Sequence, residues 1–166
     1  MTLVALSFGS NLGDKKNNIT KALDEIRKRK LLRNIKVSPI INTRALLKPN
    51  SPRAWDLDFL NCIAVGESDY GANSLLLELQ KVERIVSKRI KVTWTPREID
   101  VDILLYGKQC ISNKLLTIPH EDMLNKKFIL QLLSGVDDSL YYPVKGQFYE
   151  MRFGKILKEI YESETV

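Results

Sequence analysis

Apolar residues recur along this chain with two different periods, one typical of strands and one typical of helices. Short apolar runs predict strands at residues 3–8, 35–43, 59–65, 99–106 and, more weakly, 111–118. Apolar residues three and four positions apart predict helices at residues 15–28, 72–89, 120–133 and 153–161. Because the strands are short and their connections uneven, we expect an α+β sandwich with helices packed on a mainly antiparallel sheet.

Two polar segments break this pattern. Residues 42–55 include two prolines and have no clear period, and residues 91–98 include Thr95, Pro96 and Arg97. Loops of this length are uncommon in compact domains and are often functional. We expect both to act as lids that exclude water from an active site.

Length and composition narrow the class of protein. The chain has 166 residues, which fits one domain with a substantial core, and 44% of its residues are apolar. A net charge of +6 favours an anionic partner such as nucleic acid, a nucleotide or phosphate, although a solvated basic surface explains it equally well. No segment reaches the roughly 20 apolar residues that span a membrane, and the N-terminal segment lacks signal-peptide features. We expect a soluble, cytoplasmic protein.

The two cysteines, Cys62 and Cys110, lie in apolar, strand-like surroundings. Neither belongs to a motif of the metal-binding kind. We interpret them as reduced, buried thiols of a cytosolic protein, with a disulfide between them as the open alternative.

The most specific local pattern is an acidic pair within an apolar strand. Because side chains alternate between the two faces of a strand, Asp100 and Asp102 project together, about 7 Å apart. The opposite face is apolar and is expected in the core: Ile99, Val101, Ile103 and Leu105. A cation such as Mg²⁺ would relieve the repulsion between the two carboxylates. A solvated outer face explains a bare acidic pair better, but Trp94 and Arg97 just upstream offer stacking and phosphate binding and favour a metal–phosphate site.

Other residues carry weaker signals, each with an ordinary structural alternative. Gln80 and Glu83 share a helix face and would contact an adenine or ribose, or simply face solvent. His120, the only histidine, is either a cap or surface residue or a donor to a phosphate oxygen. Phe59 and Asn61 share a strand face, which suits a flat heteroaromatic ligand, although Phe59 would equally pack in the core.

The glycine-containing turn at residues 9–14 is a further weak signal. It lacks the lysine and the spacing of a P-loop, so a plain strand-to-helix turn is favoured. Asp14 at its end is expected to cap the helix that follows.

Taken together, four segments in the same order resemble the 6-hydroxymethyl-7,8-dihydropterin pyrophosphokinases of folate biosynthesis. These segments are residues 9–13, 59–61, 94–107 and 116–123, and the resemblance extends over residues 3–136. It implies a ferredoxin-like fold with one pyrophosphokinase domain over residues 1–166. It also implies two Mg²⁺ ions, and transfer of the pyrophosphoryl group of ATP to the pterin hydroxymethyl group with release of AMP.

The resemblance also assigns roles to individual residues. Asp100 and Asp102 match the metal ligands and, with Arg97, the catalytic residues. The residues that match the nucleotide site are Gln80, Glu83, Lys88, Arg89, Trp94, Thr117 and His120. Those that match the pterin site are Thr43, Phe59, Asn61 and Phe128. Which of Lys88, Arg89 and Lys91 contacts phosphate stays open, as does the group that accepts the hydroxyl proton.

This chain departs from the usual family pattern at several positions. Thr95 replaces a glycine between Trp94 and Pro96, and Arg44-Ala45 replaces two prolines in the first loop. Glu121 stands at a frequent aromatic position, and Lys126 at a frequent arginine position. The departures concern loop behaviour and secondary phosphate contacts, whereas the metal and pterin sites are intact.

Two other functions fit parts of the pattern less well. A nucleotidyltransferase would place its Gly-Ser turn close to the acidic pair, but Ser10 and Asp100 are far apart in this sequence. An RNA-binding domain of this fold would present aromatic and basic residues on its central strands, where this chain has two acids. We therefore expect a monomer that binds ATP and 6-hydroxymethyl-7,8-dihydropterin, with neither nucleic acid nor membrane as a partner.

Overall fold

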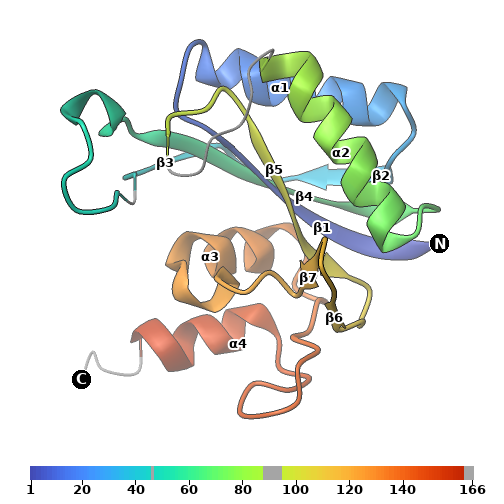
Figure 1. Ribbon diagram of the computed structural model, residues 1–166. Coiled ribbons are helices and arrows are strands. Elements are labelled where there is room, and N and C mark those ends of the chain that lie inside the picture. Colours follow the sequence, from blue (N-terminus) through green and yellow to red (C-terminus); the bar gives the residue numbers. More distant parts are fainter. Residues whose placement is uncertain (46, 88–94, 163–166) are drawn as a thin grey trace.

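The computed structural model describes residues 1–45, 47–87 and 95–162, and its centre is a five-stranded antiparallel sheet (Figure 1). Its strands are β1 (Thr2–Ser10), β2 (Arg33–Val37), β3 (Ile41–Thr43), β4 (Phe59–Ser68) and β5 (Asp100–Tyr106). They are arranged in the order β2-β4-β1-β5, with β3 also paired to β4. The chain thus forms two strand–helix–strand units, which place β1 and β4 side by side in the centre of the sheet. This is a ferredoxin-like fold, and it confirms the predicted α+β class.

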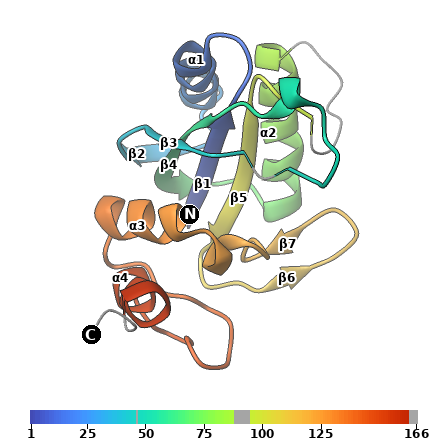
Figure 2. The same ribbon diagram turned by 90° about the vertical axis from the view of Figure 1, so that its left-hand side faces the viewer.

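Helices cover the sheet from both sides. Helices α1 (Lys15–Lys28) and α2 (Ala72–Ser87) lie on one face, and α3 (Lys127–Val136) and α4 (Phe153–Leu157) lie on the other (Figures 1 and 2). Short 3₁₀ turns occur at Arg53–Trp55 and Met123–Asn125, and α4 continues into a π-helical turn at Lys158–Glu162. Within the described residues, no helix has both the length and the apolarity needed to cross a membrane.

The face under α1 and α2 is mainly apolar. Alternate residues of β1, namely Val4, Leu6 and Phe8, are at most 1% exposed and pack against both helices. Helix α1 begins where the sequence predicted, because the Asp14 side chain accepts a hydrogen bond from the Asn17 backbone N–H.

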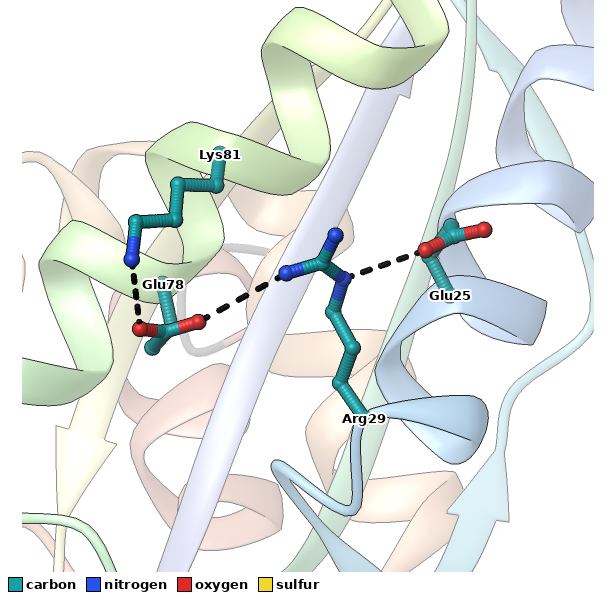
Figure 3. A network of polar contacts seen from close by, with 4 residues as sticks. All are labelled: Glu25, Arg29, Glu78 and Lys81. Atoms are coloured by element: carbon teal, nitrogen blue, oxygen red, sulfur yellow. Dashed lines mark hydrogen bonds and ion pairs between the residues drawn. The ribbon is translucent and has the colours of Figure 1, made fainter.

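An ion-pair network joins the outer surfaces of these two helices (Figure 3). Arg29 at the end of α1 pairs with Glu25 of α1 at 3.1 Å and with Glu78 of α2 at 3.8 Å. Lys81 pairs with the other oxygen of Glu78 at 2.9 Å. Since these side chains are partly exposed, the network contributes modestly to stability and mainly fixes how α1 lies against α2.

The opposite face of the sheet is covered over only part of its area. A second apolar cluster joins Ala5, Ile63 and Leu104 to residues of α3 and α4. Further along the same face of β1 come Ser7 and Gly9, and β4 presents Asn61 and Phe59 there. The sheet therefore has a covered half and an open half on this side.

Strand β5 changes face partway along its length. Leu6 pairs with Ile103 whereas Ala5 pairs with Leu105, so Leu104 is an extra residue in a β-bulge. The prediction that Leu105 shares a face with Ile103 is therefore wrong, and Leu105 packs in the second cluster. Asp100 and Asp102 precede the bulge, and the predicted alternation holds for them.

Two predicted strands are interrupted. Residues 35–43 form β2 and β3 instead of one strand, because Ser38 and Pro39 lie between them. The Ser38 hydroxyl accepts the Ile63 backbone N–H at 2.8 Å, and proline has no N–H to donate. The weaker strand at residues 111–118 is a small hairpin of β6 (Ile111–Ser112) and β7 (Thr117–Ile118).

Two more expectations are corrected by the structure. The helix expected from residue 120 begins only at Lys127, because the chain turns after His120: the His120 ring and carbonyl accept the backbone N–H groups of Asp122 and Met123. Cys62 is buried as expected, whereas Cys110 lies outside any strand and is exposed, and both are free thiols.

Candidate functional site

The open half of the sheet forms the floor of a cleft of about 560 Å³. Its floor residues lie in rows across three strands. Gly9 of β1 pairs with Asn61 of β4 on one side and with Asp100 of β5 on the other. Because neighbouring strands are about 4.8 Å apart, the Asn61 and Asp100 backbones are roughly 10 Å apart. In the next row Ser7 pairs with Asp102.

Three segments distant in sequence supply the walls of this cleft. The end of β3 and the chain between β3 and β4 (teal in Figure 1) contribute Thr43, Arg44, Ala45, Leu47 and Trp55. The segment before β5 contributes Thr95 and Arg97. The turn that leads into α3 and the first turn of that helix contribute His120, Asp122, Asn125, Lys126 and Phe128. Eight of the predicted site residues thus line one cleft: Thr43, Phe59, Asn61, Arg97, Asp100, Asp102, His120 and Phe128.

One end of the cleft is charged. The Arg97 Nη1 lies 3.1 Å from the Asp100 carboxylate, and both side chains are about one-fifth exposed. The Arg97 Nε is buried and has no hydrogen-bond partner among the described residues. A buried N–H group without a partner is costly, so this atom is suited to an oxygen supplied by a ligand.

His120 lies beside the second acid of the pair. Its Nδ1 accepts the Asp122 backbone N–H at 3.2 Å, so in the neutral ring the proton is on Nε2. This Nε2 is 4.0 Å from the Asp102 carboxylate. The turn holds His120 in place, because its backbone N–H donates to the Leu104 carbonyl at 3.0 Å. His120 therefore presents an N–H donor to the charged end of the cleft.

The other end of the cleft combines a fixed amide with aromatic rings. The Asn61 Nδ2 donates to the Thr43 hydroxyl at 2.5 Å, which turns the amide oxygen toward Gly9. Asn61 is 9% exposed, and Phe59, Trp55 and Phe128 are half-buried. Phe59 lines the cleft and belongs to neither core cluster, so its expected role in the core is not seen and its role toward a ligand stays a prediction.

The acidic pair also suits a divalent cation. Among the residues that the structure describes, no three His, Cys, Asp or Glu side chains gather into a metal cage. Mg²⁺ is commonly bound by only one or two carboxylates together with substrate phosphates and water. Asp100 and Asp102 line the same cleft from one strand face and are partly exposed, so they fit a site of this kind.

Six residues predicted for the nucleotide are not among those that line this cleft. Gln80 and Thr117 are exposed on α2 and β7. Glu83 accepts the Val101 backbone N–H at 2.9 Å and so ties α2 to β5. The other three, Lys88, Arg89 and Trp94, lie outside the described residues.

The structure adds cleft residues that the sequence did not single out for a role. Trp55 follows two prolines in a polar loop. An isolated aromatic residue in such a loop was the one sign in the sequence that this position binds a ligand or packs on the cleft. Asn125 and Asp122 occupy the turn before α3, where the apolar pattern had predicted a helix. Asn11 belongs to the turn at residues 9–14 and is 3% exposed, yet it lines the cleft.

Comparison with known proteins gives a consistent result. The sequence pattern of the family described as 7,8-dihydro-6-hydroxymethylpterin-pyrophosphokinase (HPPK) matches residues 5–138. A folate synthesis bifunctional protein of Chlamydia muridarum is 36% identical over 160 residues, which are 95% of this chain and 34% of that protein. The 2-amino-4-hydroxy-6-hydroxymethyldihydropteridine pyrophosphokinase of Aquifex aeolicus is 31% identical over 166 residues, which are 100% of this chain and 94% of that protein.

The chain thus spans about a third of the chlamydial protein and nearly all of the Aquifex protein. Among solved structures, an HPPK-DHPS of Plasmodium falciparum superposes with a TM-score of 0.69 at 14% identity. The match covers 99% of this chain and 42% of the other. At this identity the likeness supports the fold alone.

Proposed function

Because this chain belongs to the 7,8-dihydro-6-hydroxymethylpterin-pyrophosphokinase family, we propose that it transfers the pyrophosphoryl group of ATP to 6-hydroxymethyl-7,8-dihydropterin. The acceptor is the hydroxymethyl group, and AMP is released. In this proposal one pyrophosphokinase domain spans residues 1–166 and catalyses a step of folate biosynthesis in the cytoplasm. Both substrates are small molecules, and neither nucleic acid nor a membrane takes part.

The observation that carries the proposal is the division of one cleft into two chemically different ends. Arg97, Asp100 and Asp102 at one end suit a polyphosphate with its cation. Asn61 and Phe59 at the other end suit a flat heterocycle that offers donors and acceptors along its rim. The two ends lie on β4 and β5, on either side of β1, so a heterocycle and a phosphate chain would meet over Gly9 of β1.

At the charged end, the protein positions and neutralises the phosphate chain. Phosphoryl transfer needs positioning and charge stabilisation more than covalent help from the protein. In the proposed mechanism the pterin hydroxyl attacks the β-phosphorus of ATP in line with the departing AMP oxygen. Mg²⁺, with two ions expected, would be held by Asp100 and Asp102 and would neutralise phosphate charge when bound. Arg97 donates guanidinium N–H groups to a phosphate oxygen, and His120 donates its Nε2–H to another.

At the other end, the protein recognises the heterocycle. The bond to Thr43 holds the Asn61 amide in one orientation, so its free acceptor and donor positions are presented in fixed directions. Phe59 and Phe128 offer aromatic surfaces against which the ring would stack. In this proposal the active unit is a monomer.

The direct test follows AMP released from ATP in the presence of Mg²⁺ and the pterin. We expect AMP only when all three are supplied, and no turnover with Asp100→Asn or Asp102→Asn although both variants fold. Asp69→Asn removes an acid that pairs with Arg33 on the surface outside the cleft, and it should leave turnover intact. Full activity in either acidic-pair variant would contradict the metal assignment.

A second measurement separates loss of chemistry from loss of binding. Arg97→Ala should lower kcat more than it raises the KM for ATP, because charge on the transferred group is greatest in the transition state. Release of AMP without pterin, or saturable pterin binding without AMP, would contradict the proposed reaction.

A further inference from the structure

Asn11 makes an unusual set of contacts at the end of β1. Its backbone N–H donates to the Arg97 carbonyl at 3.1 Å, and its side-chain Oδ1 accepts the Arg97 backbone N–H at 2.8 Å. Asn11 and Arg97 are thus joined at two points although 86 positions separate them in the sequence. The side chain of Asn11 takes the place of a backbone carbonyl and continues the β1–β5 pairing beyond Gly9 and Asp100.

The same side chain also reaches the chain between β3 and β4. The Asn11 Nδ2 lies 3.4 Å from the Leu57 carbonyl, just before β4 begins. Lys15 contacts the same stretch, since its Nζ donates to the Asp58 carbonyl at 2.8 Å. Asn11 therefore lies between the segment that carries Arg97 and the segment that carries Trp55, and its amide orientation is fixed because its two partners are one donor and one acceptor.

We propose that Asn11 is the positioning residue that holds Arg97 in its catalytic place. This inference rests on the proposed function, in which Arg97 stabilises charge on the transferred group. The backbone of Arg97 is bound at both its N–H and its C=O, which leaves only the side-chain torsions free. The guanidinium then meets Asp100, three residues further on, and lines the charged end of the cleft. Only a side chain with an acceptor and a donor at this reach makes both of the Asn11 contacts.

The proposal predicts a specific loss of rate. Asn11→Ala removes the acceptor for the Arg97 N–H and frees the residue to shift. Since a displacement of about 1 Å of a catalytic group can cost roughly 100-fold in rate, we expect kcat to fall by about 10- to 100-fold. The KM for the pterin should change by less than about threefold, because Asn61 and Phe59 keep their own supports.

A double-variant cycle distinguishes positioning from a general structural role. If Asn11 acts through Arg97, Asn11→Ala should lower the single-turnover rate of the wild-type protein. In a protein that already carries Arg97→Ala, the same change should lower the rate by less than about twofold. Asn18→Ala is the matched control. Asn18 is 7% exposed and donates to the Leu12 carbonyl at 3.0 Å in the same turn, but neither Arg97 nor Leu57 is among its partners. It should lose stability without a comparable loss of kcat.

Hydrogen exchange at the Arg97 amide gives an assay that does not need activity. Asn11→Ala should speed this exchange at least tenfold relative to Asn18→Ala. Equal rate losses from Asn11→Ala in both backgrounds, or an unchanged Arg97 exchange rate, would overturn the positioning role. A wild-type protein that releases no AMP would instead overturn the proposed function, and amide exchange alone would then decide whether Asn11 fixes Arg97.

Discussion

Gly9 is the position at which a single methyl group should separate pterin recognition from folding. It lies between Asn61 and Asp100 in the floor of the cleft. A Cβ at this position would lie 3.1 Å from the Asn61 Oδ1 and 3.5 Å from a ring carbon of Phe59. Gly9→Ala therefore places a methyl group against the two side chains that we assign to the heterocycle.

The size of the effect follows from these contacts. At 3.1 Å the Asn61 amide must move by a few tenths of an ångström, against its 2.5 Å bond to Thr43. Weakening one or two hydrogen bonds from the amide to the ligand costs about 1–3 kcal/mol, which corresponds to a roughly 10- to 100-fold higher KM for the pterin. Packing strain of about 1–3 kcal/mol is partly offset by the roughly 0.5–1 kcal/mol advantage of Ala over Gly in a strand. The net loss of stability should therefore be about 0–2.5 kcal/mol.

Steady-state kinetics with each substrate varied, together with urea unfolding, tests this reasoning. Gly66→Ala is the structural control, because its Cβ would lie 2.9 Å from the Arg33 backbone carbonyl, outside the cleft. It should lower stability more than Gly9→Ala while leaving the pterin KM unchanged. Gly71→Ala, where a Cβ meets nothing within 4 Å, should change neither quantity.

Two results would refute the argument. An unchanged pterin KM in Gly9→Ala would mean that Asn61 does not contact the heterocycle or that the methyl group is accommodated elsewhere. A KM for ATP that rises as much as that for the pterin would mean that Gly9 supports the whole cleft floor instead of its heterocycle end.

Three further predictions concern stability and reactivity. Arg29→Ala should lower the free energy of unfolding by about 0.5–1 kcal/mol at low salt, and the difference should shrink in 1 M salt, as urea titrations would report. The bonds that Ser139 donates, first from its hydroxyl, lower the pKa of Asp137. The ionised Asp137 therefore stabilises the fold above its unfolded pKa of about 4, and this stabilisation is lost as pH falls through its lower folded pKa. The free energy of unfolding should thus differ less between pH 6 and pH 3 in Asp137→Asn than in the wild type. A thiol reagent should modify Cys110 in the native protein but Cys62 only after unfolding, because burial raises the pKa of Cys62 to about 12.

The acidic pair could be predicted from sequence because its information is local. Side-chain alternation over a few residues is enough to place Asp100 and Asp102 on one face of a strand. The bulge at Leu104 could not be predicted in this way. Residues 103–106 are all apolar or aromatic, so the pattern contains no sign of where the strand changes face.

The role of Asn11 also lay beyond the sequence. Asparagine is common in turns for local reasons, and nothing near residue 11 indicates a partner 86 positions away. The same holds for Ser38, whose hydroxyl replaces a ladder bond and divides a predicted strand in two. Sequence patterns reveal periods and motifs, whereas single polar contacts between distant segments depend on the folded chain.

The hydrogen bonds along the outer side of β5 have a consequence for association between molecules. β5 lies at the end of the strand order, where an exposed strand edge invites pairing with another chain. Here the Val101 backbone N–H donates to the Glu83 carboxylate, and the Leu104 carbonyl accepts the backbone N–H of His120. Residues beside the proposed nucleotide site thereby also block edge-to-edge β-pairing. The bond from residue 120 is made by the backbone, so the side chain that matters for this edge is Glu83. A substitution of Glu83 that spares catalysis should therefore still promote aggregation, because it frees the Val101 N–H.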